Sequence, residues 1–448
     1  ERKATTMAPL EKMKDTIEQT LLDHGVQVQV NDIKAGPRIV RFGLVPGWSL
    51  KSPGMDPKEK NRVKVQSIVS REKDLALALQ TPYIRIEAPV PGEPIIGLEV
   101  PNPSPAKVPL SLVTNSDQFV KMTQSGGLPI ALGQDTGGEP VSLDLATLPH
   151  LLIAGSTGSG KSVCINSLIA SLLLTQGPDK LRMLMIDPKR VELTPFNGLP
   201  HLVKPVIVDT DEVSGGLKGL MREMFRRYRM MEDAGSRNIV AYNKKAKNDE
   251  QLPYLVLVVD ELADLMMSAS GDVEHNLVRL AQLGRATGIH LVLATQRPSV
   301  QVVTGLLKAN IPGRVAFAVA SNVDSRVILD TVGAEKLLGQ GDMLLLSNSS
   351  PKPKRVQGTL VKDSEISAMV KYWVNQNGPE LLPLPMDFSD DDDDEMIDDK
   401  ILDESRKLAI RYPNMSRSHL ERQLRIGATK AGRIINILEE EGLVNMSF

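Results

Sequence analysis

The sequence predicts an α/β protein in which a mainly parallel sheet is preceded by an α+β segment and followed by a small helical segment. Three observations lead to this prediction. Between about residues 116 and 375, short apolar runs alternate with longer runs of helical periodicity, the pattern of βαβ units. The short runs are almost continuously apolar, as expected for strands that are covered on both faces. One of them leads into a Gly-rich loop and then a helical pattern.

Composition is that of an ordinary globular protein and excludes several classes. The 448 residues, 41% of them hydrophobic and 24% charged, suffice for roughly three domains. Cys164 is the single cysteine, which excludes a disulfide framework and a multi-cysteine zinc site. Aromatic residues at 3% argue against an aromatic-lined sugar or single-strand platform. No apolar run reaches the ~18 residues of a membrane-spanning helix. The first residue, Glu1, is compatible with a processed form that a membrane segment preceded.

The first segment, residues 1–115, carries no chemical motif. A helical pattern at 10–22 is followed by strand-like alternation at 26–30 and 39–44, a Pro-, Gly- and Lys-rich loop at 46–60, and a strand-like run at 95–100. We expect an α+β module with a structural or ring-forming role.

The central segment contains the pattern for the main sheet. Strands are predicted at 151–154, 181–186, 254–259, 290–294, 314–319 and 342–346. Helices are predicted at 161–174, 214–233 and 273–284.

The last two segments differ sharply in composition. Residues 376–400 are Pro-rich and then Asp-rich, and 386–400 alone carry nine acidic residues and one lysine. They read as a flexible linker, which leaves the rest of the chain net positive. Residues 401–448 contain helical patterns at 416–424 and 428–441 around a Gly-containing turn, followed by a β-prone tail at 442–448. This predicts a helix-turn-helix of the winged type.

The strongest motif is a phosphate-binding loop. Residues 155–162 read Gly-Ser-Thr-Gly-Ser-Gly-Lys-Ser, a full match to G-x-x-x-x-G-K-[ST] after an apolar strand. Backbone amides of such a loop surround phosphate, and the helix N-terminus favours negative charge. We expect Lys161 to reach the β and γ oxygens of ATP and Ser162 to bind Mg²⁺. The predicted nucleotide-binding residues are Gly155, Ser156, Thr157, Gly158, Ser159, Gly160, Lys161, Ser162 and Val163.

A second motif ends in two carboxylates. The apolar run at 255–259 is followed by Asp260 and Glu261, which fits a Walker B element. We expect Asp260 to hold the metal through water and Glu261 to orient or deprotonate the attacking water. Because a nucleotide switch needs no such second carboxylate, the pair predicts an ATPase.

Other residues follow predicted strands in the same way. Gln296 follows the strand at 290–294 and either senses the γ-phosphate and orients water or is an ordinary strand-to-loop junction. Asp187 and Lys189 follow the strand at 181–186 and are weaker candidates. His290 and Cys164 are expected to be core residues.

Multi-subunit P-loop ATPases require an arginine from a neighbouring subunit to neutralise charge on the γ-phosphoryl group. Arg285 lies between a predicted helix and the next strand, where a subunit edge is plausible. Arg314 and Arg326 compete with it, and the residues alone leave the choice open.

Taken together, these motifs resemble the FtsK/SpoIIIE family of DNA-translocating motors, over nearly the whole chain. The matching segments are 155–162 (GSTGSGKS), 185–189 (MIDPK), 257–267 (LVVDELADLMM), 288–299 (GIHLVLATQRPS), 304–312 (TGLLKANIP), 324–326 (DSR) and 338–343 (LGQGDM).

The resemblance implies an architecture and a function. Residues 1–115 would be the ring-forming α domain, 116–375 the RecA-like P-loop β domain, 376–400 the acidic linker and 401–448 the winged-helix γ domain. The implied function is ATP-dependent translocation of double-stranded DNA by a homohexameric ring, oriented by the γ domain, in chromosome segregation and cell division. It also implies a site-specific recombinase as a partner of the γ domain. The chain itself would be cytoplasmic, and the full-length protein anchored at the bacterial inner membrane at the division septum.

The resemblance also implies roles for individual residues. Arg285 would be the arginine finger, acting with Lys161, Glu261 and Gln296 in catalysis. DNA would be contacted by Arg297, Lys308 and Arg326 in the pore and by Arg425, Thr429, Lys430 and Arg433 in the γ domain. Basic groups that track phosphates suit a motor that moves along any sequence.

The sequence departs from the family pattern at four places. They are Asn322 where a lysine is frequent, Thr429 and Asn436 in the recognition helix, and the long loop at 48–62. Because base readout depends on side-chain identity, the departures at Thr429 and Asn436 lead us to expect a different preferred DNA sequence.

Two other classes of function compete with this reading. A DNA-binding regulator gated by its P-loop is disfavoured by the adjacent carboxylates. A secretion ATPase that moves protein is disfavoured by the basic recognition helix, for which a polypeptide transporter has no evident use.

Overall fold

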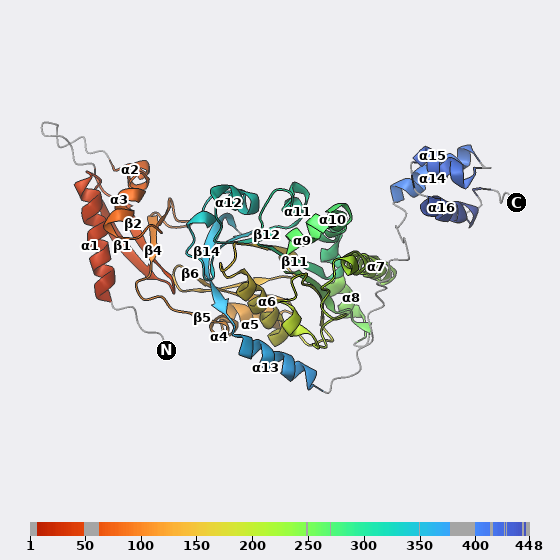
Figure 1. The fold of residues 1–448 in the computed structure, drawn as a ribbon, viewed down its shortest axis with the longest axis horizontal. Coiled ribbons are helices and arrows are strands. Elements are labelled where there is room, and N and C mark those ends of the chain that lie inside the picture. The colour runs from red at the N-terminus through yellow and green to blue at the C-terminus, as the bar shows by residue number, and fades with distance from the viewer. Residues whose placement is uncertain are drawn as a thin grey trace. The chain divides into compact units, whose positions relative to one another are not determined.

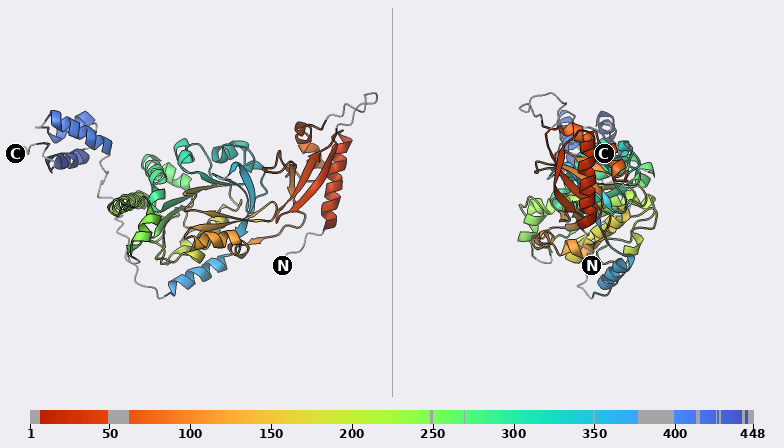
Figure 2. Two further views of the ribbon diagram at one scale, coloured as in Figure 1. Left: turned by 180° about the vertical axis from the view of Figure 1, so that it is seen from behind. Right: turned by 90° about the vertical axis from the view of Figure 1, so that its left-hand side faces the viewer.

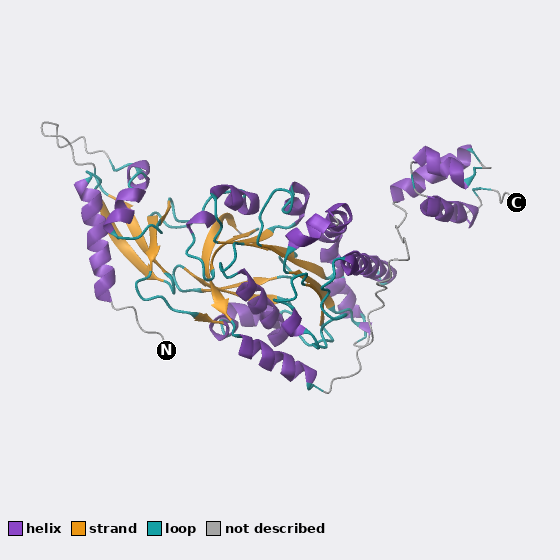
Figure 3. Cartoon of the chain, in the orientation of Figure 1, coloured by secondary structure: helices purple, strands orange, loops and turns teal. Residues whose placement is uncertain are grey.

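The computed structural model describes residues 7–48, 62–247, 250–268, 270–348, 350–376, 399–412, 415–424, 426, 428–440 and 443–444. The chain divides into two compact units, Glu1–Asp387 and Phe388–Phe448. The first unit contains two sheets and the second contains helices (Figures 1 and 3).

The N-terminal sheet is antiparallel and has one long helix packed against it (Figure 2). Its strands are β1 (Val28–Ala35), β2 (Ile39–Pro46), β3 (Arg85–Glu87) and β4 (Ile96–Pro101), in the order β1-β2-β4-β3. Helix α1 (Met7–Asp23) buries Leu10, Ile17 and Leu21, a helical spacing, in the same core as Phe42 of β2. The short helices α2 (Val65–Val69) and α3 (Glu72–Ala78) complete this region.

The predicted elements of this region are largely present. The helix predicted at 10–22 is α1, and the strand at 39–44 is β2. The strand predicted at 26–30 begins later and runs further, as β1. Most of the loop that departs from the family pattern, 49–61, lies outside the described residues.

The larger sheet has the order β7-β6-β14-β13-β12-β8-β11-β10-β9, with β5 (Val108–Pro109) beside β14. Its strands are β6 (Pro129–Asp135), β7 (Pro140–Asp144), β8 (His150–Ala154), β9 (Leu181–Ile186), β10 (Tyr254–Val259), β11 (Ile289–Thr295), β12 (Gly313–Phe317), β13 (Asp342–Ser347) and β14 (Ser350–Leu360). All six predicted strands are found.

The sheet is parallel only in part, which corrects the expectation of a mainly parallel sheet. Neighbours in the run β12-β8-β11-β10-β9 are parallel, whereas those in the run β12-β13-β14-β6-β7 are antiparallel. The sequence did not reveal β14, because its first residues, Ser-Pro-Lys-Pro-Lys, contain two prolines that argue against a strand.

Helices cover this sheet and shield its apolar strands. One group consists of α4 (Leu110–Thr114), α5 (Asp117–Gln124), α6 (Lys161–Thr175) and α13 (Asp363–Val374), and α6 packs on β6 and β14. A second group, apart from the first in Figure 1, consists of α9 (Leu262–Ser268), α10 (Ser270–Thr287), α11 (Gly305–Asn310) and α12 (Asn322–Leu329). Helices α7 (Asp211–Asp233) and α8 (Ile239–Lys245) complete the set, and α7 packs on α10. The predicted helices correspond to α6, α7 and α10.

The second unit contains α14 (Asp399–Arg411), α15 (Arg417–Leu424) and α16 (Ala428–Glu440) around a small core. Leu420 of α15 and Ile434 and Leu438 of α16 are fully buried in it. Helices α15 and α16 are the predicted helix-turn-helix pair. Apart from 443–444, the tail predicted to be β-prone lies outside the described residues, as does the linker at 377–398.

Candidate functional site

The site lies at the carboxyl ends of the parallel strands, where the loop 155–160 connects β8 to α6. Gly158 and Gly160 have φ values of 76° and 112°, which favour glycine. Gly160 also packs so closely that a Cβ would lie 2.5 Å from the amide nitrogen of Gly341. These glycines let the backbone turn into the first amides of α6, the arrangement that binds phosphate.

Lys161 and Asp260 form a buried ion pair at the centre of the site. The Lys161 ammonium donates to Oδ1 of Asp260 at 2.6 Å and to the Asp260 carbonyl at 2.7 Å, and the residues are 3% and 0% exposed. Burial raises the pKa of Asp260 above its ordinary value, and the nearby Lys161 ammonium partly offsets this. In this structure the carboxylate is the anionic partner of the lysine.

The residues predicted to bind metal are suited to Mg²⁺. The second oxygen of Asp260, Oδ2, is buried and has no hydrogen-bond partner among the described residues. Ser162 offers a hydroxyl, which here donates to Glu192 at 2.7 Å. Such hard oxygen donors are the ones that Mg²⁺ prefers. In the part of the chain that the structure describes, no cluster of three or more His, Cys, Asp or Glu forms a ready-made metal site.

Glu261 is the second buried carboxylate, 1% exposed at the end of β10. One of its oxygens accepts from the Thr295 hydroxyl at 2.7 Å and the other from the Lys189 ammonium at 2.9 Å, and the Gln296 amide donates to both. Burial acts to raise the pKa of Glu261, but these hydrogen bonds outweigh it and hold that pKa below its ordinary value. The carboxylate is therefore ionised and oriented, as a base or water-orienting group must be.

Gln296 lies beside the phosphate-binding loop. Its side-chain oxygen accepts a hydrogen bond from the hydroxyl of Thr157 in the phosphate-binding loop at 2.9 Å. Two motifs separated by 139 residues thus meet because β8 and β11 are neighbours in the sheet.

Glu192, which sequence reasoning did not assign, also contacts the site, and so does the loop that Asp187, one of the weaker candidates, shapes. Glu192 holds Ser162, and no motif marks it, since it lies in a loop after β9. Asp187 shapes that loop, because one of its oxygens accepts the amides of Val191, Glu192 and Leu193 at 2.9–3.0 Å. Lys189, considered only as a weak candidate, contacts Glu261.

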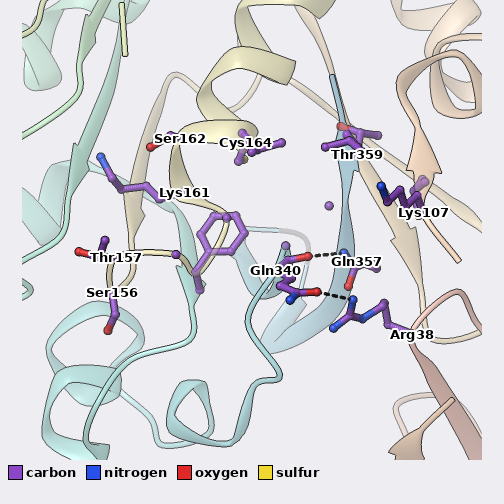
Figure 4. A pocket seen from close by; sticks show the side chains of 18 of the residues that line it. Arg38, Lys107, Ser156, Thr157, Lys161, Ser162, Cys164, Gln340, Gln357 and Thr359 are labelled. Atoms are coloured by element: carbon purple, nitrogen blue, oxygen red, sulfur yellow. Dashed lines mark hydrogen bonds between the residues drawn. The ribbon is translucent and has the colours of Figure 1, made fainter. Parts of the chain in front are cut away.

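A cavity of about 520 Å³ opens beside the loop, a size typical of small-molecule sites (Figure 4). One wall is formed by the phosphate-binding loop and the first turn of α6, with Glu192 and Gln296. The facing wall is formed by residues 357–360 of β14, residues 106–108, Gln340 and Arg38.

Arg285 does not belong to this cavity. It is exposed in the last turn of α10, just before β11 starts at Ile289, whereas the phosphate-binding loop follows the other end of the parallel strand β8. A strand of five residues spans roughly 17 Å, so Arg285 is remote from the site of its own chain. Arg314, another candidate for the arginine finger, forms an ion pair with Asp330, with its guanidinium nitrogen 2.6 Å from the carboxylate oxygen.

The basic residues predicted to meet DNA lie on or next to helices of the second group. Arg297 and Arg326 are exposed, after β11 and in α12 respectively. Lys308 of α11 is paired with Asp330 at 2.7 Å. In the second unit, Arg425 lies outside the described residues. Thr429, Lys430, Arg433 and Asn436 fall on α16, but their side chains are not described.

The residues expected to be core residues are buried. Burial lowers the pKa of His290 to about 4, so the ring is neutral at pH 7. Burial raises the pKa of the Cys164 thiol to about 12, which leaves it unreactive.

Comparison with family models places the chain among known sequences. A model of the FtsK/SpoIIIE family matches residues 112–300, a model of the FtsK alpha domain matches 1–102, and a model of the FtsK gamma domain matches 396–447.

Curated relatives match almost the whole chain. The DNA translocase FtsK of Halalkalibacterium halodurans is 45% identical over 97% of this chain and 54% of its own length. The DNA translocase SpoIIIE of Bacillus subtilis is 44% identical over 96% of this chain and 54% of its own. The chain thus spans about half the length of these relatives.

Solved structures share the fold. The conjugation coupling protein TcpA, in a monomer form with ATPγS, is 24% identical with a TM-score of 0.54 over 81% of this chain and 99% of its own, and this shows the fold alone. The cytoplasmic domain of the type VII secretion ATPase EccC of Thermomonospora curvata is 27% identical with a TM-score of 0.53, over 62% of this chain and 36% of its own.

Proposed function

Because this chain belongs to the FtsK/SpoIIIE family, we propose that it is an ATP-dependent translocase of double-stranded DNA, working as a hexameric ring in chromosome segregation and cell division. The observation that supports this most is the hydrogen-bonded convergence of Lys161, Asp260, Glu261 and Gln296 beside the phosphate-binding loop, in a chain that also has a gamma-domain match. The group of converging residues predicts ATP hydrolysis, and the gamma-domain match predicts DNA binding.

The proposed hydrolysis begins with an exchange of partners at Lys161. The Lys161 ammonium leaves Asp260 and binds the β- and γ-phosphate oxygens. The Asp260 carboxylate then no longer has the positive charge that neutralises it in this structure. Asp260 and Ser162 are the residues that would hold Mg²⁺, which would supply neutralisation of charge on the phosphates.

Glu261 is the proposed group that orients and deprotonates water. Its ionised state supports this role, and its hydrogen bonds to Thr295 and the Gln296 amide hold it at the strand end. Lys189 occupies one of its oxygens in this structure. That oxygen becomes available to water when the exposed lysine swings away.

Arg285 is proposed to act on the site of a neighbouring subunit. Its exposure, and its place at the opposite ends of the strands from the phosphate-binding loop, suit an arginine that is supplied from outside. A homohexameric ring in which subunits repeat head to tail would bring it to the next cavity.

DNA contact is proposed for two sets of basic residues. Arg297, Lys308 and Arg326 would track phosphates in the ring, and Lys308 would first have to leave Asp330. Arg425, Thr429, Lys430 and Arg433 would contact DNA from the γ domain, whose helix-turn-helix pair α15–α16 supports such a role.

The domain division follows the same proposal. Residues 1–115 would be the α domain, 116–375 the β domain, 376–400 the linker and 401–448 the γ domain. A site-specific recombinase is a proposed partner of the γ domain. Among the described residues, none of the helices is long and apolar enough to cross a membrane, and anchoring at the septum is proposed only for a segment outside this chain.

The test is ATP turnover with and without long duplex DNA, together with displacement of the third strand from a triplex. We expect DNA to stimulate turnover and the third strand to be removed. The likeness to a secretion ATPase makes protein translocation the alternative, and turnover that ignores DNA in a ring-forming sample would favour it.

A further inference from the structure

Part of the facing wall of the cavity belongs to the N-terminal region. Arg38, in the turn between β1 and β2, and Lys107, just before β5, both line it, facing the phosphate-binding loop of the larger sheet (Figure 4). Neither residue lies in a nucleotide-binding motif.

The turn that carries Arg38 is firmly attached to the segment that carries Lys107. The Asn102 side chain donates to the Gly36 carbonyl at 2.7 Å, and its backbone amide donates to the Arg38 carbonyl at 2.8 Å. The amide of Ala106 donates to the Pro37 carbonyl at 2.7 Å. Arg38 and Lys107 are therefore presented together, by the backbone of the N-terminal region.

Arg38 reaches across to Gln340, which has an unusual conformation. Its guanidinium donates to the side-chain oxygen of Gln340 at 2.9 Å. Gln340 has a φ of 50°, between Gly339 and Gly341 with φ values of 70° and 94°. A non-glycine residue in the left-handed region is strained, and such strain is concentrated at functional sites. Here it turns the glutamine side chain toward Arg38.

The two ends of the cavity suit different ends of a nucleotide. The phosphates belong with the loop amides, Lys161 and Ser162. The cavity continues past Val163 and Cys164 in the first turn of α6 to the facing wall, where hydrogen-bonding groups from Arg38, Lys107 and Gln340 gather. These groups suit ribose hydroxyls and a purine edge.

We propose that Arg38 binds the ribose–base end of ATP, so that the N-terminal region completes the nucleotide site. The inference rests on the proposed ATPase function and names a ligand that the phosphate-binding motif does not supply. The loop 339–341 then connects both ends, because the Gly341 amide donates to the Ser159 carbonyl at 2.8 Å while Gln340 holds Arg38.

The test compares two ligands by calorimetry on the full chain without DNA. ATPγS contains the whole nucleotide, whereas inorganic tripolyphosphate contains only the phosphate end. We expect Arg38→Ala to weaken ATPγS binding on the order of tenfold, the effect of one hydrogen bond to a charged group, and to leave tripolyphosphate binding unchanged. Unchanged tripolyphosphate binding also demonstrates that the variant is folded around an intact loop.

Two control variants define the outcome. Lys34→Ala, in the neighbouring strand β1 with its ammonium 3.3 Å from Glu93, is expected to change neither affinity. Lys161→Ala is expected to weaken both. The proposal is overturned if Arg38→Ala weakens both ligands equally or neither of them. These affinities do not depend on DNA, so a failure of the translocase proposal would leave them unaffected.

Discussion

The region where the two sheets of the first unit meet offers the sharpest stability prediction. Arg355 of β14 forms a two-point contact with Asp342 of β13, at 2.6 and 3.0 Å, and donates to Glu99 of β4 at 2.9 Å. All three residues are at most 4% exposed. Replacing Arg355 by Met keeps much of the volume but leaves two buried carboxylates without this cation.

The magnitude follows from what remains after the substitution. Removing one partner of a buried ion pair costs about 3–5 kcal/mol. Arg85 still donates to Glu99 at 3.2 Å, and the Leu338 amide still donates to Asp342 at 2.8 Å. These contacts place the expected loss at the lower limit, about 3 kcal/mol. Because the entropy of unfolding grows with size and this unit spans Glu1–Asp387, the fall in Tm is expected to be only about 4 °C.

The assay is equilibrium denaturation of Arg355→Met at pH 7, with Lys354→Met as the control. Lys354 is the preceding residue of β14, half exposed and paired with Asp135, and its loss is expected to cost no more than about 1 kcal/mol. If both variants lose equally little free energy of unfolding, the two carboxylates are solvated in Arg355→Met and the reasoning is wrong.

The same network predicts a dependence on pH. Burial acts to raise the pKa of Glu99, but Arg85 and Arg355 outweigh it and lower that pKa from 4.5. The stabilisation from Glu99 is therefore complete above pH 4.5 and is lost as the pH falls through the lowered value. The difference between parent and Arg355→Met is expected to shrink in acid.

The remaining predictions concern hydrolysis. Glu261→Gln should reduce phosphate release at least ~100-fold while ATPγS still binds; turnover near the parent rate would exclude Glu261 as the base. Because hydrogen bonds, including that from Lys189, hold the pKa of Glu261 below its ordinary value, Lys189→Met should move upward the part of the acid limb of the turnover–pH profile that Glu261 sets; an unmoved limb would contradict the role of this lysine. Arg285→Ala should lower turnover ~1,000-fold or more without loss of ATP binding. Mixing it with Lys161→Ala subunits should restore turnover, since one variant retains the arginine and the other the loop; a mixture as inactive as its components would count against action between subunits.

The candidate site was largely predictable because its chemistry is encoded locally. The loop 155–162 needs glycines, a lysine and a serine in a set order, and the carboxylates Asp260 and Glu261 must follow an apolar strand. Both motifs are short, and each can be recognised without knowing where the other lies. Their meeting was also foreseeable, since the carboxyl ends of parallel strands share one edge of a sheet.

Other residues that contact or line the site were not predictable from such local motifs. Glu192 lies in an irregular loop, and Arg38 lies 302 residues from Gln340. In the antiparallel half of the sheet, β14 was missed for a related reason, since it begins with prolines and is stabilised by pairing with β13 and β6.

Periodicity and residue order thus sufficed to identify the strands around the phosphate-binding loop and the residues for which hydrolytic roles are proposed. Only the tertiary structure established which residues form the cavity wall that faces that loop. It also established that the N-terminal region provides part of this wall. The reason is physical: helical or strand character and loop chemistry depend on neighbours along the chain, whereas strand order and close contacts depend on how distant surfaces bury each other.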